Sequence, residues 1–310
     1  MMIQNLKSGE PFKGIFLITD WKEAAFRNKP GHYLILTCQD RSGSIGGKVW
    51  EINSQMQNWL QEFDIFEMSG QVNEFRGVSE LTIETLQPIP ENSIDLAELL
   101  PASPIPASDL EKRLKALIQE IKDPYLNLFM NQILNDPKIG EAYRSCPAAR
   151  KIHQAYLRGL WEHSVKVAEL ASSLAAHYPE ADRDLIIAGA LLHDLGKISE
   201  YEYMRGIEVT TEGRLLGHIL IGIQLVLREI DKILGFPIAY KTKLMHILAS
   251  HHGRYEWQSP KRPKTVEAFI VHYADAMEAE LWQFRHAKEE HPDSEWSPYM
   301  PSMERYLYLK

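Results

Sequence analysis

Cysteine is scarce in this sequence. Cys38 and Cys146 are the only two among 310 residues, and their spacing is not that of a Cys-x-x-Cys pair. Two such cysteines are too few for a disulfide framework, so we expect both to be reduced, structural thiols.

Long apolar runs are absent as well. No stretch approaches the ~20 apolar residues that cross a bilayer. The N-terminal residues also lack the charged segment followed by an apolar stretch that a secretory signal needs. We therefore expect a cytoplasmic protein without a membrane partner.

Positive charge is in the minority. Lys and Arg total 34 against 42 Asp and Glu, which gives a net charge of −8. This balance argues against a broad basic surface that holds nucleic acid through phosphate contacts alone. It does not exclude an enzyme that acts on nucleic acid, because acidic side chains can be metal ligands, and a bound cation adds positive charge that formal counting omits.

The remaining composition is that of an ordinary globular protein, with 45% hydrophobic and 25% charged residues and no internal repeat. A single core would be unusually large for 310 residues, because domains commonly contain ~100–200 residues. We therefore expect a protein of two domains.

The first 90 residues have the alternation and the β-branched or aromatic content of strands. The predicted strands are residues 12–19, 33–40, 45–52, 65–74 and 78–86, with a helix-like stretch at 53–61. Five short strands with a helix after the third is the order of an OB-fold barrel, which often binds single-stranded nucleic acids or oligosaccharides. We predict an all-β OB-fold domain at residues 1–90 that binds nucleic acid. The alternative is a small barrel that only docks a partner.

Proline-rich sequence follows the strand pattern, at residues 88–90 and 100–106. Such punctuated, weakly periodic sequence is typical of a linker, which we place at residues 91–107. Ser108 has the position of a helix N-cap, with Glu111 three residues later. From there on the pattern is helical, so we predict an all-α helical bundle at residues 108–310, in which the tail 297–310 fits no element.

Histidine and aspartate residues lie on the apolar faces of the predicted helices. His163, for example, heads a stripe with Val167 and Leu170. A single histidine on an apolar face is usually a hydrogen-bonded core residue. Seven His and Asp residues on successive helices favour a metal site instead, because leaving them unpaired would cost about 1–3 kcal/mol each. The seven are His163, His193, Asp194, His218, His251, His252 and Asp275.

The ligand types restrict the metal. Imidazoles combined with carboxylates suit Mn, Fe, Co, Ni or Zn better than Ca. Seven ligands exceed what one tetrahedral or octahedral ion readily uses. We therefore expect two divalent metal ions as cofactors, with Mn as the first choice and Fe, Co, Ni, Zn and Mg as alternatives.

The order of these residues is a His, a His-Asp pair thirty residues later, a His, a His-His pair and an Asp, and it resembles the signature of the HD superfamily of metal phosphohydrolases. Lys197 follows Asp194 as in the superfamily's His-Asp-x-x-Lys form. The resemblance implies that one ion is held by His163, His193, Asp194 and Asp275, and the second by the other three histidines. Asp194 and Lys197 are then the catalytic residues: Asp194 bridges the two ions, and Lys197 neutralises charge on the phosphoryl group. The alternative for Lys197 is a cation at a helix C-terminus.

The segment before His163 has a further pattern. It comprises Tyr143-Arg144, Pro147-Ala148-Ala149-Arg150, His153, Ala155-Tyr156, Gly159-Leu160 and Glu162-His163. Together with the barrel pattern, this segment resembles the YhaM-type 3′–5′ exoribonucleases over residues 1–290, although Arg150, Gln154 and Arg158 depart from that family's pattern. The resemblance implies hydrolysis of phosphodiester bonds in single-stranded RNA, with DNA as a further candidate substrate, by metal-activated water.

Two groups of residues are candidates for substrate binding, because guanidinium groups grip phosphate and aromatic rings stack on bases. Near the metals they are Arg144, Arg150, His153 and Tyr156. In the barrel they are Lys22, Arg27, Arg41 and Lys48. For the first group, the alternative is a solvated turn with one packed tyrosine.

Other functions stay open at this point. An HD-type phosphohydrolase or phosphodiesterase could act on a small nucleotide, but the Gly-Tyr-Pro signature of the cyclic-dinucleotide class is absent after His251 and His252. A non-catalytic RNA-binding adaptor with a structural metal would be expected to have lost some ligands. A diiron oxygenase would leave the barrel without a role. The oligomeric state does not follow from the sequence, and a homo-oligomer is one of the options.

Overall fold

The structure is a computed structural model that describes residues 2–26, 28–75, 77–150, 154–204 and 206–310. It divides into two compact units. One consists of Met1–Ala102 with Glu202–Ile207, and the other of Ser103–Tyr201 with Glu208–Lys310. The division between residues 102 and 103 falls inside the predicted linker 91–107, and the predicted domain boundaries stay a prediction.

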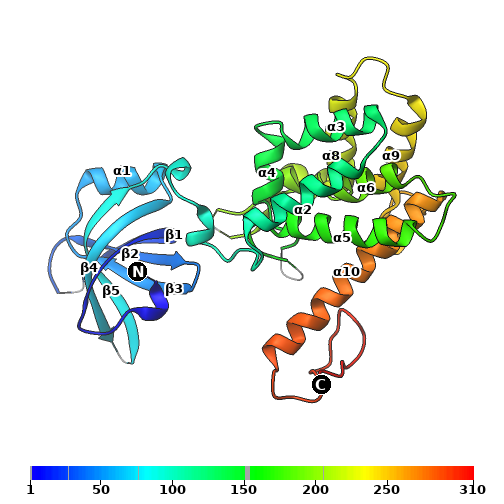
Figure 1. Cartoon of the computed structure of the whole chain (residues 1–310). Helices are drawn as coiled ribbons and strands as arrows, with labels where there is room; N and C mark the ends of the chain where they lie inside the picture. Colours follow the sequence, from blue (N-terminus) through cyan, green and yellow to red (C-terminus); the bar gives the residue numbers. More distant parts are fainter. Residues whose placement is uncertain (1, 27, 76, 151–153, 205) are drawn as a thin grey trace. The chain divides into compact units, whose positions relative to one another are not determined.

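The first unit is a closed five-stranded barrel, which confirms the predicted OB-like fold (Figure 1). Its strands are β1 (Pro11–Ala25), β2 (His32–Asp40), β3 (Gly43–Val49), β4 (Ile65–Phe75) and β5 (Val78–Pro88), in the order β1-β2-β3-β5-β4. The pair β3 and β5 is parallel and the other pairs are antiparallel. Helix α1 (Ser54–Glu62) lies between β3 and β4 in the chain, as predicted.

Every second side chain along the strands points into the barrel and fills its interior. On β2, Leu34, Leu36 and Cys38 point inward and are fully buried, so one face of each strand supplies the core. Strand β1 runs six residues beyond the predicted end at residue 19 and pairs with β2 as far as Ala25 and His32. The sequence missed this extension because residues 20–25 lack the regular apolar alternation of the core strands, since three of the six are charged and only Trp21 packs against the barrel core.

The second unit is the predicted helical bundle. Its helices are α2 (Ala107–Glu120), α3 (Pro124–Leu134), α4 (Ile139–Ser145), α5 (Gly159–Ala175), α6 (Arg183–Leu192), α7 (Lys197–Glu200), α8 (Thr211–Ile230), α9 (Ile238–Ser250) and α10 (Val266–Glu290). The predicted N-cap at Ser108 is wrong: Pro106 is the N-cap of α2, and its carbonyl accepts from the N–H of Leu110. The helical pattern is also interrupted by two short strands, β6 (Tyr201–Glu202) and β7 (Glu208–Val209), which form a two-stranded sheet.

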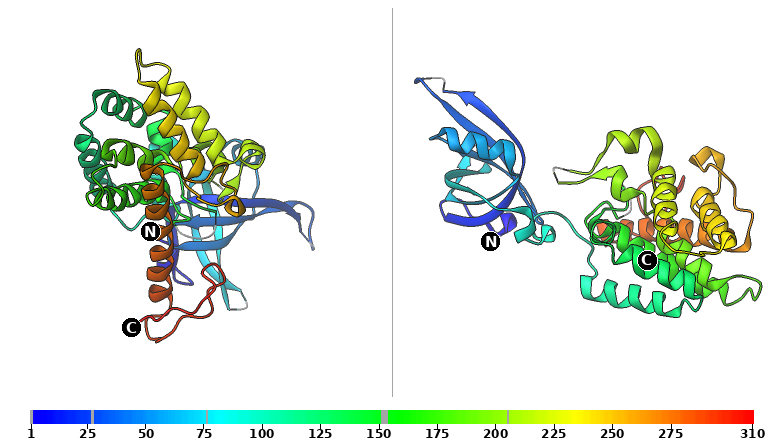
Figure 2. Two further views of the ribbon diagram at one scale, coloured as in Figure 1. Left: turned by 90° about the vertical axis from the view of Figure 1, so that its right-hand side faces the viewer. Right: turned by 90° about the horizontal axis from the view of Figure 1, so that it is seen from above.

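Helix α6 is the centre of this bundle, since its residues from Leu185 to Leu192 are all buried. Helices α5, α9 and α10 pack around it. Helix α10 runs past the other helices, and the C-terminal tail folds back on its end (Figure 2). Met303, Leu307 and Leu309 of the tail form a small apolar cluster with Ala287 of α10. None of the described helices combines the length and the apolarity needed to cross a bilayer.

Both cysteines are free and buried, as expected. Burial raises the pKa of the Cys38 thiol to about 12 and also raises that of Cys146. Neither thiol is therefore a reactive thiolate near neutral pH.

The helical unit begins with a buried contact at Ser103. The Ser103 hydroxyl donates to the Glu162 carboxylate over 2.6 Å, and its N–H donates to the Leu157 carbonyl. Because Glu162 is fully buried on α5, this contact ties the start of the unit to the helix that also carries His163.

We expect a fragment 103–310 to be more stable than a fragment 108–310, because the shorter one loses the bond from Ser103 to a buried carboxylate. Such bonds contribute about 1.5–3 kcal/mol, which corresponds to a loss of roughly 3–12 °C in Tm for a chain of this size. Thermal unfolding measures the difference. Fragment 103–310 with Ser103→Ala isolates the hydroxyl bond and should unfold at a lower Tm than fragment 103–310; equal Tm values for these two would contradict the assignment.

Candidate metal centre

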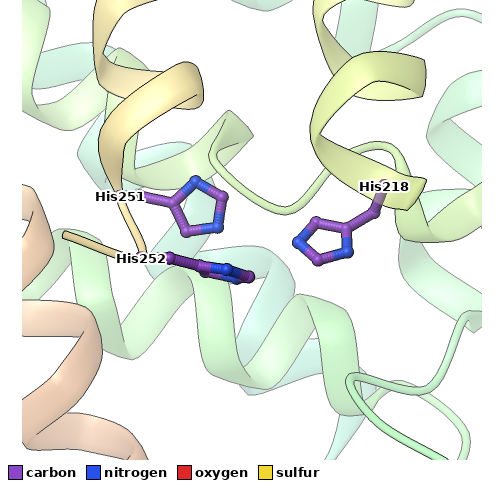
Figure 3. Close-up of side chains that lie close together, drawn as sticks. All are labelled: His218, His251 and His252. Carbon is purple, nitrogen blue, oxygen red and sulfur yellow. The ribbon is translucent and has the colours of Figure 1, made fainter. Parts of the chain in front are cut away.

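The seven predicted ligands come from five helices that meet at one place. His163 is the fifth residue of α5 and Asp275 lies in α10, while His193 and Asp194 follow the end of α6. The donor atoms of six of them form two groups, each with all its atoms within 4.8 Å of one another: His163, His193 and Asp194, and His218, His251 and His252. The seventh ligand, Asp275, lies beside the first group, with Oδ1 3.1 Å from His163 Nε2. The rings of the second group point toward one another from the end of α9 and from the middle of α8 (Figure 3).

Gly196 follows the first ligand pair and lies close to another part of the backbone. It has φ −62° and is the N-cap of α7. A Cβ at this position would lie 1.9 Å from the His218 carbonyl oxygen and 2.6 Å from the Gly222 nitrogen. Glycine is therefore required because the backbone of α8 approaches the Asp194 turn this closely.

Helix α8 is kinked where it supplies its ligand. Gly217 has φ 71° and ψ 155°, which breaks the helix, so that His218 begins its second half. The kink frees the N–H of His218, which donates to the Glu200 carboxylate over 3.0 Å. His218 thus lies at an internal helix start, seven residues after the helix begins at Thr211.

Every one of the five imidazoles is anchored through Nδ1. The partners are the carbonyls of Ala190 for His193, Leu248 for His251 and Trp257 for His252, and the carboxylates of Glu278 for His163 and Glu200 for His218, at 2.7–3.2 Å. Carbonyls and carboxylates only accept hydrogen bonds, so Nδ1 carries the proton in each ring. In a neutral ring with this proton, the lone pair of Nε2 is available to a cation.

Asp194 lies between the two groups of histidines. Its Oδ2 is 3.3 Å from Nε2 of His193 and 3.7 Å from that of His163. Its Oδ1 is 3.4 Å from Nε2 of His218 and 3.6 Å from that of His251. Each oxygen of one carboxylate thus faces one set of imidazoles, the arrangement that a bridging ligand requires.

Several of these inward-facing atoms are buried without a hydrogen-bond partner among the described residues. They are Nε2 of His193, His218 and His251 and Oδ1 of Asp194. Each unpaired buried polar atom costs about 1–3 kcal/mol, and coordination to a cation would satisfy them together. Imidazole nitrogens with carboxylate oxygens suit first-row transition metals, so the residues fit a divalent metal centre.

The protonation states of most of these ligands are compatible with a divalent metal centre. Burial lowers the pKa of His251. Burial, and then the electrostatic effect of the adjacent His251, lower the pKa of His252 to about 4, so both rings are neutral near pH 7. Burial acts on His163 as well, but Asp275 and Glu278 outweigh it and raise its pKa to about 10. A proton therefore competes with a cation for His163 Nε2.

Lys197 contacts the central carboxylate. Its ammonium lies 2.6 Å from Asp194 Oδ2, and although burial opposes the charge, Asp194 raises the pKa of Lys197, which stays protonated. Lys197 is the first residue of the four-residue helix α7, and its catalytic role stays a prediction. Lys197 lines a cavity of about 380 Å³, here called the metal cavity, together with Asp194, Asp275, His163, His251 and His252.

Known proteins resemble this chain along most of its length. Residues 160–280 match the HD domain family. The 3′–5′ exoribonuclease YhaM of Bacillus pumilus is 32% identical over 290 residues, 93% of this chain and 91% of that protein. The 3′–5′ exoribonucleases YhaM of Bacillus velezensis and Bacillus subtilis are 32% and 31% identical, over 97% and 93% of this chain and 95% and 91% of their own lengths. The chain belongs to the YhaM family.

Two carboxylates of this YhaM-family chain were missed as site residues in the sequence. Glu200 and Glu278 each accept from a ligand imidazole, His218 and His163 respectively. Hydrogen bonds from those rings outweigh burial and lower the pKa of both carboxylates, so both stay ionised. The signal for Glu278 was available, because it lies three residues after Asp275 and hence on the same helix face; no pattern marked Glu200.

A buried network supports Glu278 from behind. Gln154 donates to Glu278 over 2.9 Å, and the Lys166 ammonium lies 3.6 Å from it. Lys166 also contacts Glu162 at 2.5 Å. The Tyr156 hydroxyl donates to the same Glu162 over 2.8 Å. Charges in this network hold the ring of His163 in one orientation.

Three of the predicted substrate contacts near the metals have protein partners in the structure. The Arg144 guanidinium bonds to Glu111 and to the carbonyls of Leu134 and Gly140, so its donors serve the fold and not a phosphate. Tyr156 binds Glu162 through its hydroxyl, as described above, and Arg150 pairs with Glu208 at 2.9 Å on the exposed surface. His153 lies outside the described residues.

The predicted contacts in the barrel have mixed outcomes. Lys22 and Arg41 are exposed. Lys48 pairs with Glu80 at 2.8 Å, which neutralises part of its charge. Arg27 lies outside the described residues. No substrate contact follows from these positions alone, and the assignments stay predictions.

We expect Glu278→Gln to weaken metal binding about tenfold, at the lower end of the 10–100-fold loss typical when the partner of a ligating histidine is changed. The amide keeps the shape of the side chain but removes the charge that orients His163. Metal titration of the chelator-treated protein measures the dissociation constant. Glu289→Gln, an exposed change on the same helix, is the matched control, and equal affinities for the two variants would refute the role of Glu278.

Proposed function

We propose that this chain is a metal-dependent 3′–5′ exoribonuclease that hydrolyses phosphodiester bonds of single-stranded RNA. The observation that carries the proposal is the set of buried, unpaired Nε2 atoms around Asp194, within a chain that is similar over most of its length to exoribonucleases. An adaptor with a structural metal would have no need of a carboxylate between two groups of open donors beside a cavity.

Two divalent cations, with Mn as the first choice, would be held by the two groups of ligands that share Asp194. The first group is His163, His193, Asp194 and Asp275, and the second is His218, His251, His252 and Asp194. Bound divalent cations supply Lewis acidity toward phosphate oxygens and lower the pKa of water.

The residues around the ligands do the remaining work. Glu200 and Glu278 orient His218 and His163. Lys197 keeps its positive charge beside Asp194 and lines the metal cavity, so its ammonium can offset charge on a phosphate bound there. Burial of the ligands excludes bulk water, which strengthens each of these electrostatic interactions.

The barrel offers a surface that suits single-stranded nucleic acid. The rings of Phe26, Tyr33 and Trp50 lie 4.9–6.0 Å apart. Lys29 lies over Phe26 and Lys48 over Trp50. Aromatic rings beside cations bind single strands by stacking and phosphate contact, without a need for sequence. We therefore assign RNA binding to this surface, with Lys22 and Arg41 as further phosphate contacts and DNA as a second candidate substrate.

The decisive experiment incubates the metal-loaded protein with 5′-labelled single-stranded RNA and DNA. We expect a ladder of RNA products shortened from the 3′ end. Asp194→Ala should lower the rate at least about a thousandfold, because it removes the residue shared by both ligand groups. The circular dichroism of this variant should stay native. Asp293→Ala, an exposed change, is the control. Hydrolysis of small nucleotides without any shortening of RNA would contradict the proposal.

Metal content tests the two-ion arrangement separately. Elemental analysis of protein purified without chelator should give about two divalent ions per chain, as in other two-metal phosphohydrolases. His218→Ala should lower this number to about one, because His218 belongs to only one group of ligands. One ion in both proteins would refute the second position.

A further inference from the structure

The metal cavity continues into a groove along α10. A second cavity of about 700 Å³ shares Trp257, His272 and Ala276 with the metal cavity. A third, of about 660 Å³, shares Phe269 and Tyr273 with the second. We call the second and third cavities together the α10 groove. Its walls are α10, the chain between α9 and α10 and, in the third cavity, Leu174, Tyr178 and Glu180.

A row of aromatic rings follows this groove. From the metal cavity outward, the ring centroids of Trp257 and His272 are 6.4 Å apart, those of His272 and Tyr273 are 4.9 Å apart, and those of Tyr273 and Phe269 are 6.4 Å apart. Trp257 is 50% exposed, Tyr273 59% and Phe269 48%. Large apolar side chains that are half exposed and contiguous mark a binding surface rather than a core.

Cationic side chains accompany the rings. The Arg254 guanidinium lies 4.7 Å from the Trp257 ring centroid, and the Arg262 guanidinium lies 5.1 Å from that of Tyr255. Both arginines line the second cavity. Lys264 also lines the groove. The carboxylates that line it are those of Glu180 and Glu280. Cations thus outnumber anions here, against the net charge of −8 of the whole chain.

We propose that the α10 groove binds the single-stranded RNA on the 5′ side of the scissile phosphate. Tyr273 and Trp257 stack on bases, and Arg254 and Arg262 contact phosphates. The proposal rests on the proposed exoribonuclease function and extends it. Aromatic faces with guanidinium groups are the combination that binds single strands, and the groove opens directly into the metal cavity.

The length of the groove indicates on which side of the scissile phosphate the bound RNA lies. An enzyme that removes nucleotides from the 3′ end has only a short product on the 3′ side of the scissile bond. The groove runs past Tyr273 into a third cavity and so offers room for more than one nucleotide. Only the 5′ side of the substrate supplies such a length of chain.

A second copy of the chain is the competing occupant. Phe269, Tyr273, Met277 and Leu281 form an exposed stripe on α10 at every fourth position, and such a stripe can pack against another helix. The arginines and the continuity with the metal cavity favour RNA. The experiment below distinguishes the two.

The test asks whether the Tyr273 ring stacks on one particular base of the RNA. Release of the 3′-terminal labelled nucleotide is measured in single turnovers, with RNA that is intact or has an abasic nucleotide on the 5′ side of the scissile bond, at each of several positions. For the intact RNA, Tyr273→Ala should lower kcat/KM roughly five- to hundredfold, the loss expected for one stacked base. Tyr273→Trp should retain the wild-type value. Tyr306→Ala, an exposed tyrosine of the tail, is the matched control and should behave as wild type.

The abasic RNA completes a double-mutant cycle. At the position that stacks on Tyr273, the abasic change should cost the wild type about as much as Tyr273→Ala does, and should cost Tyr273→Ala nothing further. If the loss from Tyr273→Ala and the loss from the abasic nucleotide multiply at every abasic position, the proposal is overturned. Metal content measured on each variant should equal that of the wild type, which separates lost stacking from a damaged metal centre.

Two further outcomes have separate meanings. Wild-type protein that releases no 3′ nucleotide would refute the proposed function itself. Active wild type, with Tyr273→Ala indistinguishable from Tyr306→Ala, would refute the α10 groove alone. A changed molar mass of Tyr273→Ala in light scattering, without any coupling to the abasic position, would show that the stripe is an interface between copies and would also overturn the proposal.

Discussion

The orientation of five imidazole rings is the constraint on which the helical unit depends. Each ring gives its Nδ1 proton to a carbonyl or a carboxylate and presents Nε2 to the interior. To allow this, α6 and α9 end directly before their ligands, so that the carbonyls of their last turns become acceptors. Helix ends leave such carbonyls unpaired in any case, and here the ligand rings use them.

Much of this centre could be predicted from the sequence, because ligands are marked by residue type and by helical period. The seven donors, the barrel order and the helical bundle follow from local patterns. The roles of Glu200, Ser103 and Gly196 could not be predicted, because each depends on a partner distant in sequence or on a close backbone approach. Arg144 shows the converse: its type suggested phosphate, and its neighbours Glu111 and Leu134 determine otherwise.

Recognition of RNA would be divided between two surfaces of the same chemistry. The barrel has Phe26, Tyr33 and Trp50 with lysines, and the α10 groove has Trp257 and Tyr273 with arginines. Both combine rings with a few cations, which suits a chain whose overall charge is negative. Binding would then depend on local placement of charge and on stacking, and less on long-range attraction.

The kink at Gly217 has a genetic consequence. Its φ of 71° and ψ of 155° lie in a region of backbone conformation that is open essentially to glycine alone. Any other residue at 217 would favour a continuous α8, which would turn His218 away and withdraw its N–H from Glu200. Missense changes at Gly217 are therefore expected to inactivate the protein, although glycine has no side chain that could bind a metal. A survey of ligand positions alone would overlook this residue.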